Sequence, residues 1–209
     1  MAKRAFDILF SAAVLLALAP LLVAIGAWIK ADTTGPVFFR QVRVGRNGRE
    51  FRIHKFRTMR AAPGTRDMQI TIGADPRITR AGTFLRKYKL DELPQFIDVL
   101  VGDMSVVGPR PEVPRYVALY PASAREAILS VRPGITDPAS LQFRDENDVL
   151  AGSADPEATY VNEIMPAKLA LCLRYVRERN FAGDLLIVGR TIMVSFVHTG
   201  SHAAGRRKA

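Results

Sequence analysis

The sequence predicts an α+β, mainly helical fold. It consists of an N-terminal re-entrant membrane helix-break-helix, a β-hairpin, and surface amphipathic helices around one small domain. Three observations predict it: residues 8–29 are an uncharged apolar run broken by a proline, residues 36–56 alternate around an Asn-Gly pair, and the remainder carries repeated helix start and stop signals. The expected divisions are 1–30 for the membrane helix, 31–200 for the main domain and 201–209 for a basic disordered tail.

The apolar run of residues 8–29 is long enough to cross a bilayer. As one straight helix it would measure roughly 33 Å, against a hydrocarbon core of about 30 Å. Lys3 and Arg4 precede it and several basic residues follow it, so both flanks have the charge typical of the cytoplasmic side. Pro20, near its middle, lacks a backbone donor and bends a helix. A re-entrant helix that returns to the leaflet it entered satisfies both observations and ranks first.

Three other interpretations of this run stay open. A simple transmembrane span ranks second, because it would leave one basic flank on the wrong side. A cleaved signal peptide would use the Ala-Leu-Ala sequence at 17–19, but Pro20 directly after it and Asp7 in the charged region argue against cleavage. A buried core helix of a soluble protein is weaker, because the run is apolar on all faces.

Residues 36–56 predict a β-hairpin with a tight type I′ turn at Asn47-Gly48. The stretch from Lys30 to Arg60 holds nine Lys or Arg and two acids, so it carries +7 of the chain's net charge of +10. Anionic lipid headgroups would lie here, directly after the membrane segment. A solvated basic face is the plain alternative.

The rest of the chain is expected to form short helices separated by loops. Loops are predicted over 61–80, 102–112 and the acidic stretch 144–157. Helices are predicted over 82–90, 91–100, part of 113–131, 166 to about 179, and from a cap at Asp184 to about 198. The last helix has few charges, so a place on the membrane surface and packing in the core are equally plausible.

The composition excludes several classes of protein. With 48% hydrophobic and 24% charged residues, the chain is not a disordered basic tail. Its single cysteine, Cys172, cannot form an internal disulfide, and no Cys/His cluster has the spacing of a zinc site. A Ser-His-Asp constellation, a P-loop and a dinucleotide fingerprint find no support. The excess of positive charge implies a polyanionic partner: nucleic acid, an anionic membrane surface or phosphate-bearing substrates.

The sequence at 86–95 places adjacent carboxylates, Asp91 and Glu92, beside three cations that include Arg86. A carboxylate can hold Mg²⁺ or attack phosphorus, and cations neutralise the charge on phosphate oxygens. The plain alternative is helix capping by Asp91, with Glu92 favouring the helix dipole. These residues alone favour the plain alternative.

Two further clusters could bind phosphate. The Gly-Pro-Arg-Pro sequence at 108–111 is stiff and would hold the Arg110 guanidinium for a bidentate contact; an exposed arginine on a rigid loop is the alternative. At the end of the hairpin, Lys55 and Arg57 flank an aromatic residue. Nucleic acid could use such basic and aromatic side chains too.

A resemblance rests on an ordered set of motifs, each of them weak alone. In order these are residues 3–7 (Lys-Arg-Ala-Phe-Asp), Pro20, residues 35–41 (Gly-Pro-Val-Phe-Phe-Arg-Gln), 55–59 (Lys-Phe-Arg-Thr-Met), 90–95 (Leu-Asp-Glu-Leu-Pro-Gln), 102–111 and 132–136 (Arg-Pro-Gly-Ile-Thr). On these motifs, over about residues 3–190, the chain resembles the bacterial sugar transferase family, and within it the small monotopic phosphoglycosyl transferases of the PglC type.

The resemblance implies that a sugar 1-phosphate moves from a UDP-sugar to polyprenyl (undecaprenyl) phosphate, giving a polyprenyl diphosphosugar and UMP in the first membrane step of polysaccharide or glycan synthesis. It implies that Asp91 attacks the β-phosphorus and forms a covalent phosphosugar intermediate, with Mg²⁺ held by that carboxylate and the diphosphate. Glu92 would support the metal or a proton transfer. Arg86 would bind phosphate, and Arg110 with Pro111 would contact the nucleotide end.

The implied location is the cytoplasmic face of the bacterial inner membrane. Anionic lipid is an expected partner, nucleic acid is the least expected one, and a homodimer stays open. The chain departs from the family pattern at three places. Ala19 stands before the proline where many relatives have Ser, Asp-Pro-Ala-Ser at 137–140 replaces a frequent Gly-Trp-Ala-Gln, and Cys172 stands at an acidic position. The last two departures bear on sugar specificity, and all three leave the Asp-Glu pair intact.

Two alternative functions remain at this stage. One is a non-catalytic, membrane-bound module that binds anionic lipid or nucleic acid through the basic stretch 30–60. The other is a related transferase that uses direct displacement without a covalent enzyme intermediate.

Overall fold

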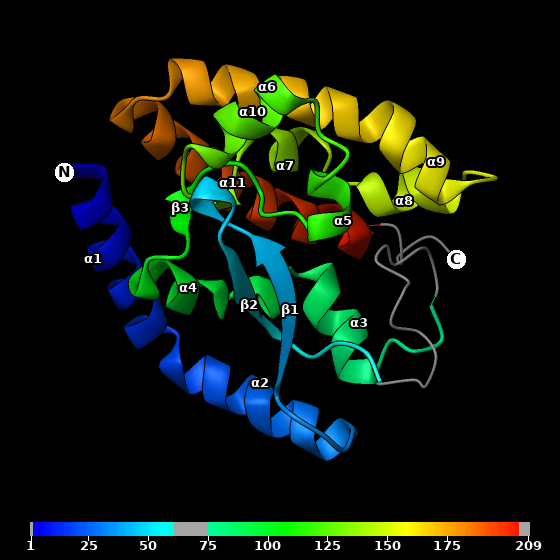
Figure 1. Cartoon of the computed structure of the whole chain (residues 1–209). Coiled ribbons are helices and arrows are strands. Elements are labelled where there is room, and N and C mark those ends of the chain that lie inside the picture. The colour runs from blue at the N-terminus through cyan, green and yellow to red at the C-terminus, as the bar shows by residue number, and fades with distance from the viewer. Residues whose placement is uncertain (1, 61–74, 205–209) are drawn as a thin grey trace.

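A computed structural model of the protein describes residues 2–60 and 75–204, with side chains as far as residue 194. Within these residues the chain is mainly helical, with a two-stranded antiparallel hairpin and a separate two-stranded parallel pair (Figure 1). The predicted α+β, mainly helical class is therefore confirmed. The expected loop at 61–74 and the tail at 205–209 lie outside the described residues.

The N-terminal apolar run forms two helices, α1 (Ala2–Ala17) and α2 (Ala19–Asp32), which meet at a bend of 62°. Pro20 lies in the first turn of α2, so the break falls where the sequence predicts it. Of the described helices, none is long and apolar enough on its own to cross a membrane, but this bent pair together has the required length and composition. In Figure 1 the pair follows the left and lower edges of the molecule.

Charged side chains in the first turns of α1 tie this helix to the rest of the molecule. The Asp7 carboxylate, only 2% exposed, accepts hydrogen bonds from the Ser105 hydroxyl (2.8 Å) and the Val106 backbone N–H (3.1 Å). The Lys3 ammonium lies 2.6 Å from the carboxylate of Asp184. The helix begins at Ala2, six residues before the apolar run, and the Lys3 charge that was expected to flank a membrane segment lies in an internal ion pair.

The hairpin pairs β1 (Phe38–Val44) with β2 (Glu50–Phe56) in antiparallel register. Asn47 and Gly48 both have positive φ, 58° and 75°, as a type I′ turn requires. The predicted hairpin and its turn are confirmed. Alternation places Phe51 and Ile53 in the core.

Between the hairpin and the C-terminal half lie α3 (Arg80–Lys87), a 3₁₀ turn η2 (Leu90–Glu92) and α4 (Gln95–Val101). The α3 helix begins two residues before its predicted start, because the Thr79 hydroxyl accepts a hydrogen bond from the Gly82 backbone N–H as an N-cap. The helix predicted over 91–100 is divided, since η2 ends before Pro94 and α4 begins after it.

The parallel pair, β3 (Ser105–Val107) and β4 (Gly134–Thr136), was not predicted. The expectation of loop over 102–112 is wrong for residues 105–107. Each strand has only three residues, too few to show an alternating pattern, and the two partners lie about 30 residues apart in the chain. Gly108 and Gly134 allow the backbones to approach closely: a Cβ built on Gly134 would lie 2.1 Å from the Gly108 nitrogen.

The C-terminal half is a series of helices. They are α5 (Pro114–Val117), α6 (Ala122–Leu129), α7 (Pro138–Gln142), α8 (Glu146–Ala151), α9 (Pro156–Thr159), the π-helical turn η3 (Tyr160–Ile164), α10 (Met165–Glu178) and α11 (Phe181–Ala204). The partial helix predicted over 113–131 and the helix predicted from Pro166 are confirmed. The expected loop over 144–157 is wrong for residues 146–151 and 156–157, because α8 and α9 carry acidic residues in their first turns, where the helix dipole favours them.

The last helix differs from its prediction at both ends. It starts at Phe181, and Asp184 is a buried ion-pair partner inside the first turn rather than a cap. It continues through Ala204, so residues 201–204 are helical and do not belong to a disordered tail.

Three groups of buried apolar side chains form the core. One lies among α5–α10, the second joins β2, α4 and β3 through Ile53, Val99 and Val106, and the third joins α2, β2 and α3 through Ile29, Phe56 and Leu85. The end of β2 takes part in both the second and the third group. This packing holds β2 against the segment that contains Asp91 and Glu92.

Candidate active site

Asp91 lies on the 3₁₀ turn η2 and is only 3% exposed. Its Oδ2 atom is 3.1 Å from the Lys55 ammonium, whereas its Oδ1 atom is buried and has no hydrogen-bond partner among the described residues. Neither η2 nor α4 has a side-chain cap, so the capping role considered for Asp91 is wrong. Leaving a buried polar atom unpaired costs about 1–3 kcal/mol, more for a charged group. This oxygen is therefore available to a ligand.

The carboxylate of Glu92 is enclosed by two cations. Lys55 Nζ lies 2.9 Å from Oε1, and the Arg110 guanidinium donates to Oε2 at 3.0 Å and to Oε1 through its second nitrogen. Burial raises the pKa of Glu92, but Arg110 and Lys55 outweigh burial and hold that pKa well below its ordinary value. Glu92 is thus ionised at neutral pH, and hydrogen bonds occupy both of its oxygens.

Arg110 is held from the backbone side as well. Its backbone N–H donates to Asp137 Oδ2 (3.1 Å), and the neighbouring carbonyl of Pro111 accepts from Arg43 (3.0 Å). The prolines on both sides fix φ. The Glu92 carboxylate raises the pKa of Arg110 above its ordinary value. The sequence prediction of a stiffly held arginine is consistent with this arrangement, but it did not indicate that Arg110 would pair with Glu92.

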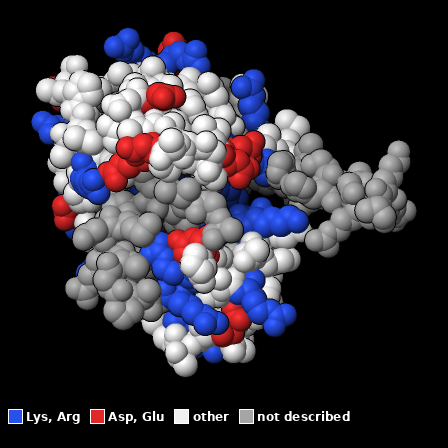
Figure 2. Space-filling view, turned by 90° about the vertical axis from the view of Figure 1, so that its right-hand side faces the viewer, with Lys and Arg blue, Asp and Glu red and all other residues white. Residues whose placement is uncertain are grey.

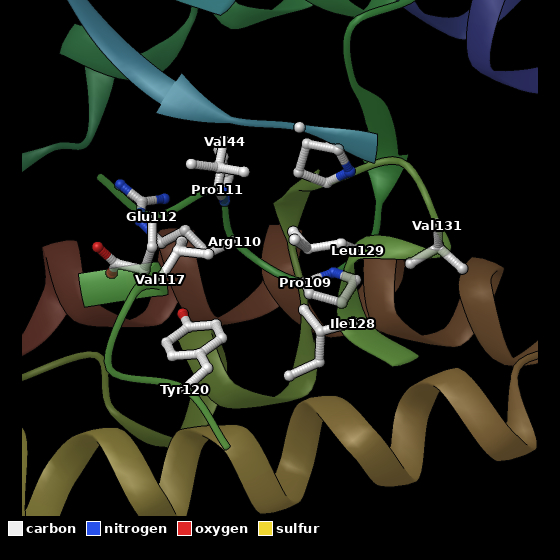
Figure 3. Close-up of a pocket in the computed structure, with 12 residues that line it drawn as sticks. Val44, Pro109, Arg110, Pro111, Glu112, Val117, Tyr120, Ile128, Leu129 and Val131 are labelled. Atoms are coloured by element: carbon white, nitrogen blue, oxygen red, sulfur yellow. The ribbon is translucent and has the colours of Figure 1, made fainter. Parts of the chain in front are cut away.

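A small, mainly apolar pocket lies beside this segment. Figure 3 shows residues 109–112 between Val44, at the end of β1, and the side chains of Tyr120 and Ile128. Arg110 is the one basic residue that lines it within the described part of the chain. The proposed contact of Arg110 and Pro111 with a nucleotide remains a prediction.

Arg86, in the last turn of α3, is near Asp91. Its Nε atom donates to the Thr58 hydroxyl (3.0 Å), and a terminal nitrogen lies 3.5 Å from the Met59 sulfur. Burial lowers the pKa of Arg86, and the Asp91 carboxylate partly offsets this effect. The structure thus brings Arg86, Lys55 and Arg110 to the two carboxylates, and Lys89 adds a fourth positive charge near them.

Arg57 faces elsewhere. Its terminal nitrogens donate to the backbone carbonyls of Thr33 (2.8 Å) and Thr34 (2.6 Å), directly after α2. A Cβ on Gly35 would lie 2.1 Å from the same guanidinium, so that glycine makes room for it. Arg57 therefore joins the end of the bent helix pair to β2, and the structure does not place it with the dyad of Asp91 and Glu92.

Two residues beside the dyad have features that the sequence does not predict, although Lys89 is one of the three cations noted beside Asp91 and Glu92. Lys89, just before η2, has φ 55°, a left-handed conformation that is uncommon for a residue with a side chain and often marks a functional site. Gln95, three residues after Glu92, is fully buried, and neither polar atom of its amide has a partner within the described residues. Neither feature has a sequence signal beyond the position next to Asp91 and Glu92.

Comparison with known proteins identifies the family. The family model described as bacterial sugar transferase matches residues 1–198. The chain belongs to the bacterial sugar transferase family. The resemblance inferred from the ordered motifs is thus confirmed.

Curated relatives of this chain are named as transferases that act on undecaprenyl phosphate or as exopolysaccharide production proteins. It is 36% identical over 203 residues to the UDP-glucose:undecaprenyl-phosphate glucose-1-phosphate transferase of Escherichia coli, covering 96% of this chain and 41% of that protein. It is 37% identical over 221 residues to the exopolysaccharide production protein ExoY of Rhizobium meliloti, covering 97% and 88%. A third relative, from Aeromonas hydrophila, is named as an N-acetylgalactosaminephosphotransferase and is 36% identical over 192 residues, covering 91% and 42%. The chain therefore spans about two fifths of the Escherichia coli relative.

Two departures of this chain from the family pattern lie in contact. The buried Asp137 caps α7 by accepting from the Ser140 N–H (2.6 Å), and its Oδ2 atom accepts from the backbone of Arg110 and from Cys172 Sγ at 3.5 Å. Burial raises the pKa of the Cys172 thiol, which therefore stays protonated and donates. Both departures thus support the segment that carries Arg110.

The donor set around Asp91 and Glu92 fits Mg²⁺ only as an ion shared with substrate. Within the described residues no three His, Cys, Asp or Glu side chains converge as a metal site. Glu92 is occupied by cations, and Asp91 keeps one unpartnered oxygen. Because Mg²⁺ is commonly held by one or two carboxylates together with substrate phosphates and water, Asp91 is sufficient for such an ion.

The described surface on the side of α3 carries many basic side chains. In Figure 2 Lys and Arg side chains gather in the lower half of the view, at the height of the hairpin, α2 and α3 in Figure 1, with acidic side chains between them. A phosphate-bearing substrate approaching this face meets a mainly positive surface.

Proposed function

We propose that this protein transfers a sugar 1-phosphate from a UDP-sugar to undecaprenyl phosphate, releasing UMP, at the cytoplasmic face of the bacterial inner membrane as a step of exopolysaccharide synthesis. The observation that carries the proposal is the buried Asp91 carboxylate, with one unpartnered oxygen and the other paired to Lys55. The names of the relatives supply the substrate class.

In the proposed first step, the unpartnered Asp91 oxygen attacks the β-phosphorus of the UDP-sugar. An Asp91 O–P bond forms, the bond from that phosphorus to the oxygen bridging the two phosphates breaks, and UMP leaves with the bridging oxygen. In the second step a phosphate oxygen of undecaprenyl phosphate attacks the same phosphorus. The Asp91 O–P bond breaks, and the diphosphosugar lipid leaves with the free carboxylate restored.

The cations around the dyad stabilise the charge that develops on phosphorus oxygens. Lys55 neutralises the Asp91 oxygen that does not attack, and Arg86 and Arg110 face the phosphates. Glu92 holds Lys55 and Arg110 in place, because its two oxygens bind both cations. Mg²⁺, bound by Asp91 and the diphosphate, would add charge neutralisation when present.

The test is UMP release by purified protein in nanodiscs that contain undecaprenyl phosphate and Mg²⁺, with a panel of UDP-sugars. We expect release of UMP and formation of one lipid diphosphosugar, with a single preferred UDP-sugar. Without acceptor lipid, we expect no more than one equivalent of UMP per enzyme. Lack of release with every UDP-sugar, together with salt-dependent binding to anionic vesicles that Asp91→Asn leaves unchanged, would instead support a non-catalytic lipid-binding module.

We also propose that α1 and α2 form a re-entrant pair. The beginning of α1 contacts β3 and α11, and the chain after α2 enters the hairpin, which packs on α4. Both ends of the pair thus join one body, which a span with its ends on opposite sides of a membrane would not permit.

Cysteine labelling tests this topology. Cys172 is buried with a raised thiol pKa, so we expect the native chain to stay unlabelled by a membrane-impermeant maleimide until it is denatured. Cysteines introduced at the exposed positions Ala2 and Arg49 should both react in inverted vesicles and neither in intact spheroplasts. Reaction of the two positions from opposite sides would mean that the bent pair crosses the membrane.

A further inference from the structure

Lys55 contacts both carboxylates of the dyad, and its placement depends on β2. That strand belongs to a ribbon of only two strands, which has little stability of its own. One side of β2 pairs with β1, and its other edge must be held by another element. A slip of one residue would turn every side chain of the strand to the opposite face.

Asp98 on α4 holds that edge immediately beside Lys55. Its Oδ2 atom accepts the backbone N–H of His54 at 2.8 Å, and its Oδ1 atom lies 2.6 Å from the His54 ring Nδ1. The carboxylate is 2% exposed. One side chain therefore binds both the backbone and the ring of the residue before Lys55, which fixes the position of the strand and its rotation together.

The neighbours of His54 determine its tautomer. Arg40, directly opposite on β1, lies 2.6 Å from Nε2 through a guanidinium nitrogen, and an arginine only donates. Nε2 must therefore accept, so Nδ1 carries the proton and donates to Asp98. The short contact between Nδ1 and Asp98 is therefore a hydrogen bond in which the ring donates.

We propose that Asp98, acting through His54, is a positioning residue for the transfer reaction: it locks β2 to the helix that follows the dyad and so places the Lys55 ammonium on Asp91 and Glu92. This inference rests on the proposed function of the site. α4 begins three residues after Glu92, so Asp98 belongs to the same rigid segment as the dyad. The hydrogen bonds between Asp98 and His54 join α4 to β2, and these two elements must keep their relative position for Lys55 to reach both carboxylates.

The first test compares His54→Asn with His54→Leu, which have nearly the same size. Asparagine can present an N–H where Nδ1 stands, and leucine cannot. We expect kcat within about threefold of the native value for His54→Asn, and about 10–100-fold lower for His54→Leu with the KM for UDP-sugar little changed. Arg49→Gln, in the exposed hairpin turn, is the control. Equal kcat values for the two His54 variants would overturn the proposal.

The second test is a double-mutant cycle between Asp98→Asn and Lys55→Met, with thermal midpoints measured in parallel. If Asp98 acts through Lys55, Asp98→Asn lowers kcat in the native background but has little further effect in Lys55→Met. An equal fold-change in both backgrounds would show that Asp98 acts independently of Lys55 and would contradict the proposal. If the Asp98→Asn variant does not fold, the comparison of His54→Asn with His54→Leu still tests the proposal.

The experiments distinguish a failure of the proposed function from a failure of the positioning role of Asp98. Lack of UMP release by the native chain would remove the function, whereas a native activity that Lys55→Met leaves unchanged would remove only the role of Lys55 and with it the positioning role of Asp98. Nitrogen-15 spectra of the native protein provide an independent readout, because His54 should show a protonated Nδ1 and an unprotonated Nε2.

Discussion

Asp91→Asn is expected to abolish sugar-phosphate transfer while leaving the fold intact. The amide retains the size of the side chain and can still face Lys55, but it is a poor nucleophile and cannot form the acyl phosphate bond. We expect kcat to fall by at least about 10³-fold, equivalent to about 4 kcal/mol of transition-state stabilisation. The measurements are UMP release and the mass of the intact protein after incubation with UDP-sugar in the absence of acceptor lipid.

The mass measurement separates the two transferase mechanisms. With a covalent intermediate, the native protein gains the mass of one sugar phosphate on Asp91, and the variant gains none. Asp148→Asn, the same chemical change at an exposed carboxylate of α8, is the matched control and should behave as the native chain. If the native protein turns over without acquiring the adduct under these conditions, direct displacement becomes the better account.

Gly134→Ala is expected to be the most destabilising single methyl addition in the parallel strand pair. A Cβ at this position would lie 2.1 Å from the nitrogen and 2.4 Å from the oxygen of Gly108, and backbone atoms cannot yield as a flexible side chain can. The two strands would have to separate. We expect a loss of about 3 kcal/mol or more and a fall in the thermal midpoint of roughly 10 °C.

Activity should fall in Gly134→Ala even below its midpoint. The Gly134 N–H bonds the carbonyl of Pro109 at 3.0 Å, so a displaced β4 moves the residue before Arg110. Gly189→Ala in α11 is the matched control: its Cβ would meet open space, and alanine favours a helix over glycine by about 1 kcal/mol. A Gly134→Ala variant as stable as the native chain would mean that the strands are not as closely packed as described.

The elements that local sequence signals determine were predictable. The hairpin follows from alternation and from an Asn-Gly pair that accepts positive φ, and the break in the apolar run follows from Pro20. The segment 144–157 was misjudged because its acidic residues resemble a solvated loop. They instead occupy the first turns of α8 and α9, where a helix N-terminus favours negative charge.

Non-local contacts could not be predicted in the same way. The chemistry of Asp91 was suggested by its neighbours in sequence, but those neighbours alone favoured a capping role. What decides against capping is the approach of Lys55, from 36 positions earlier in the chain, which leaves the other oxygen of Asp91 buried and unpartnered. Likewise, the pairing of Arg110 with Glu92 depends on the β3 and β4 strands. Each of these strands has three residues, too few for a recognisable sequence pattern.

The ion pair between Lys3 and Asp184 has a consequence for biosynthesis. Translation proceeds from the N-terminus, so α1 leaves the ribosome long before Asp184 and the Ser105 hydroxyl that Asp7 binds have been made. During that interval the charges of Lys3 and Asp7 lack their native partners. The Lys3 ion pair can therefore form only after nearly the whole chain has been synthesised, whereas the contacts of Asp7 with Ser105 and Val106 can form once about half of the chain has been made.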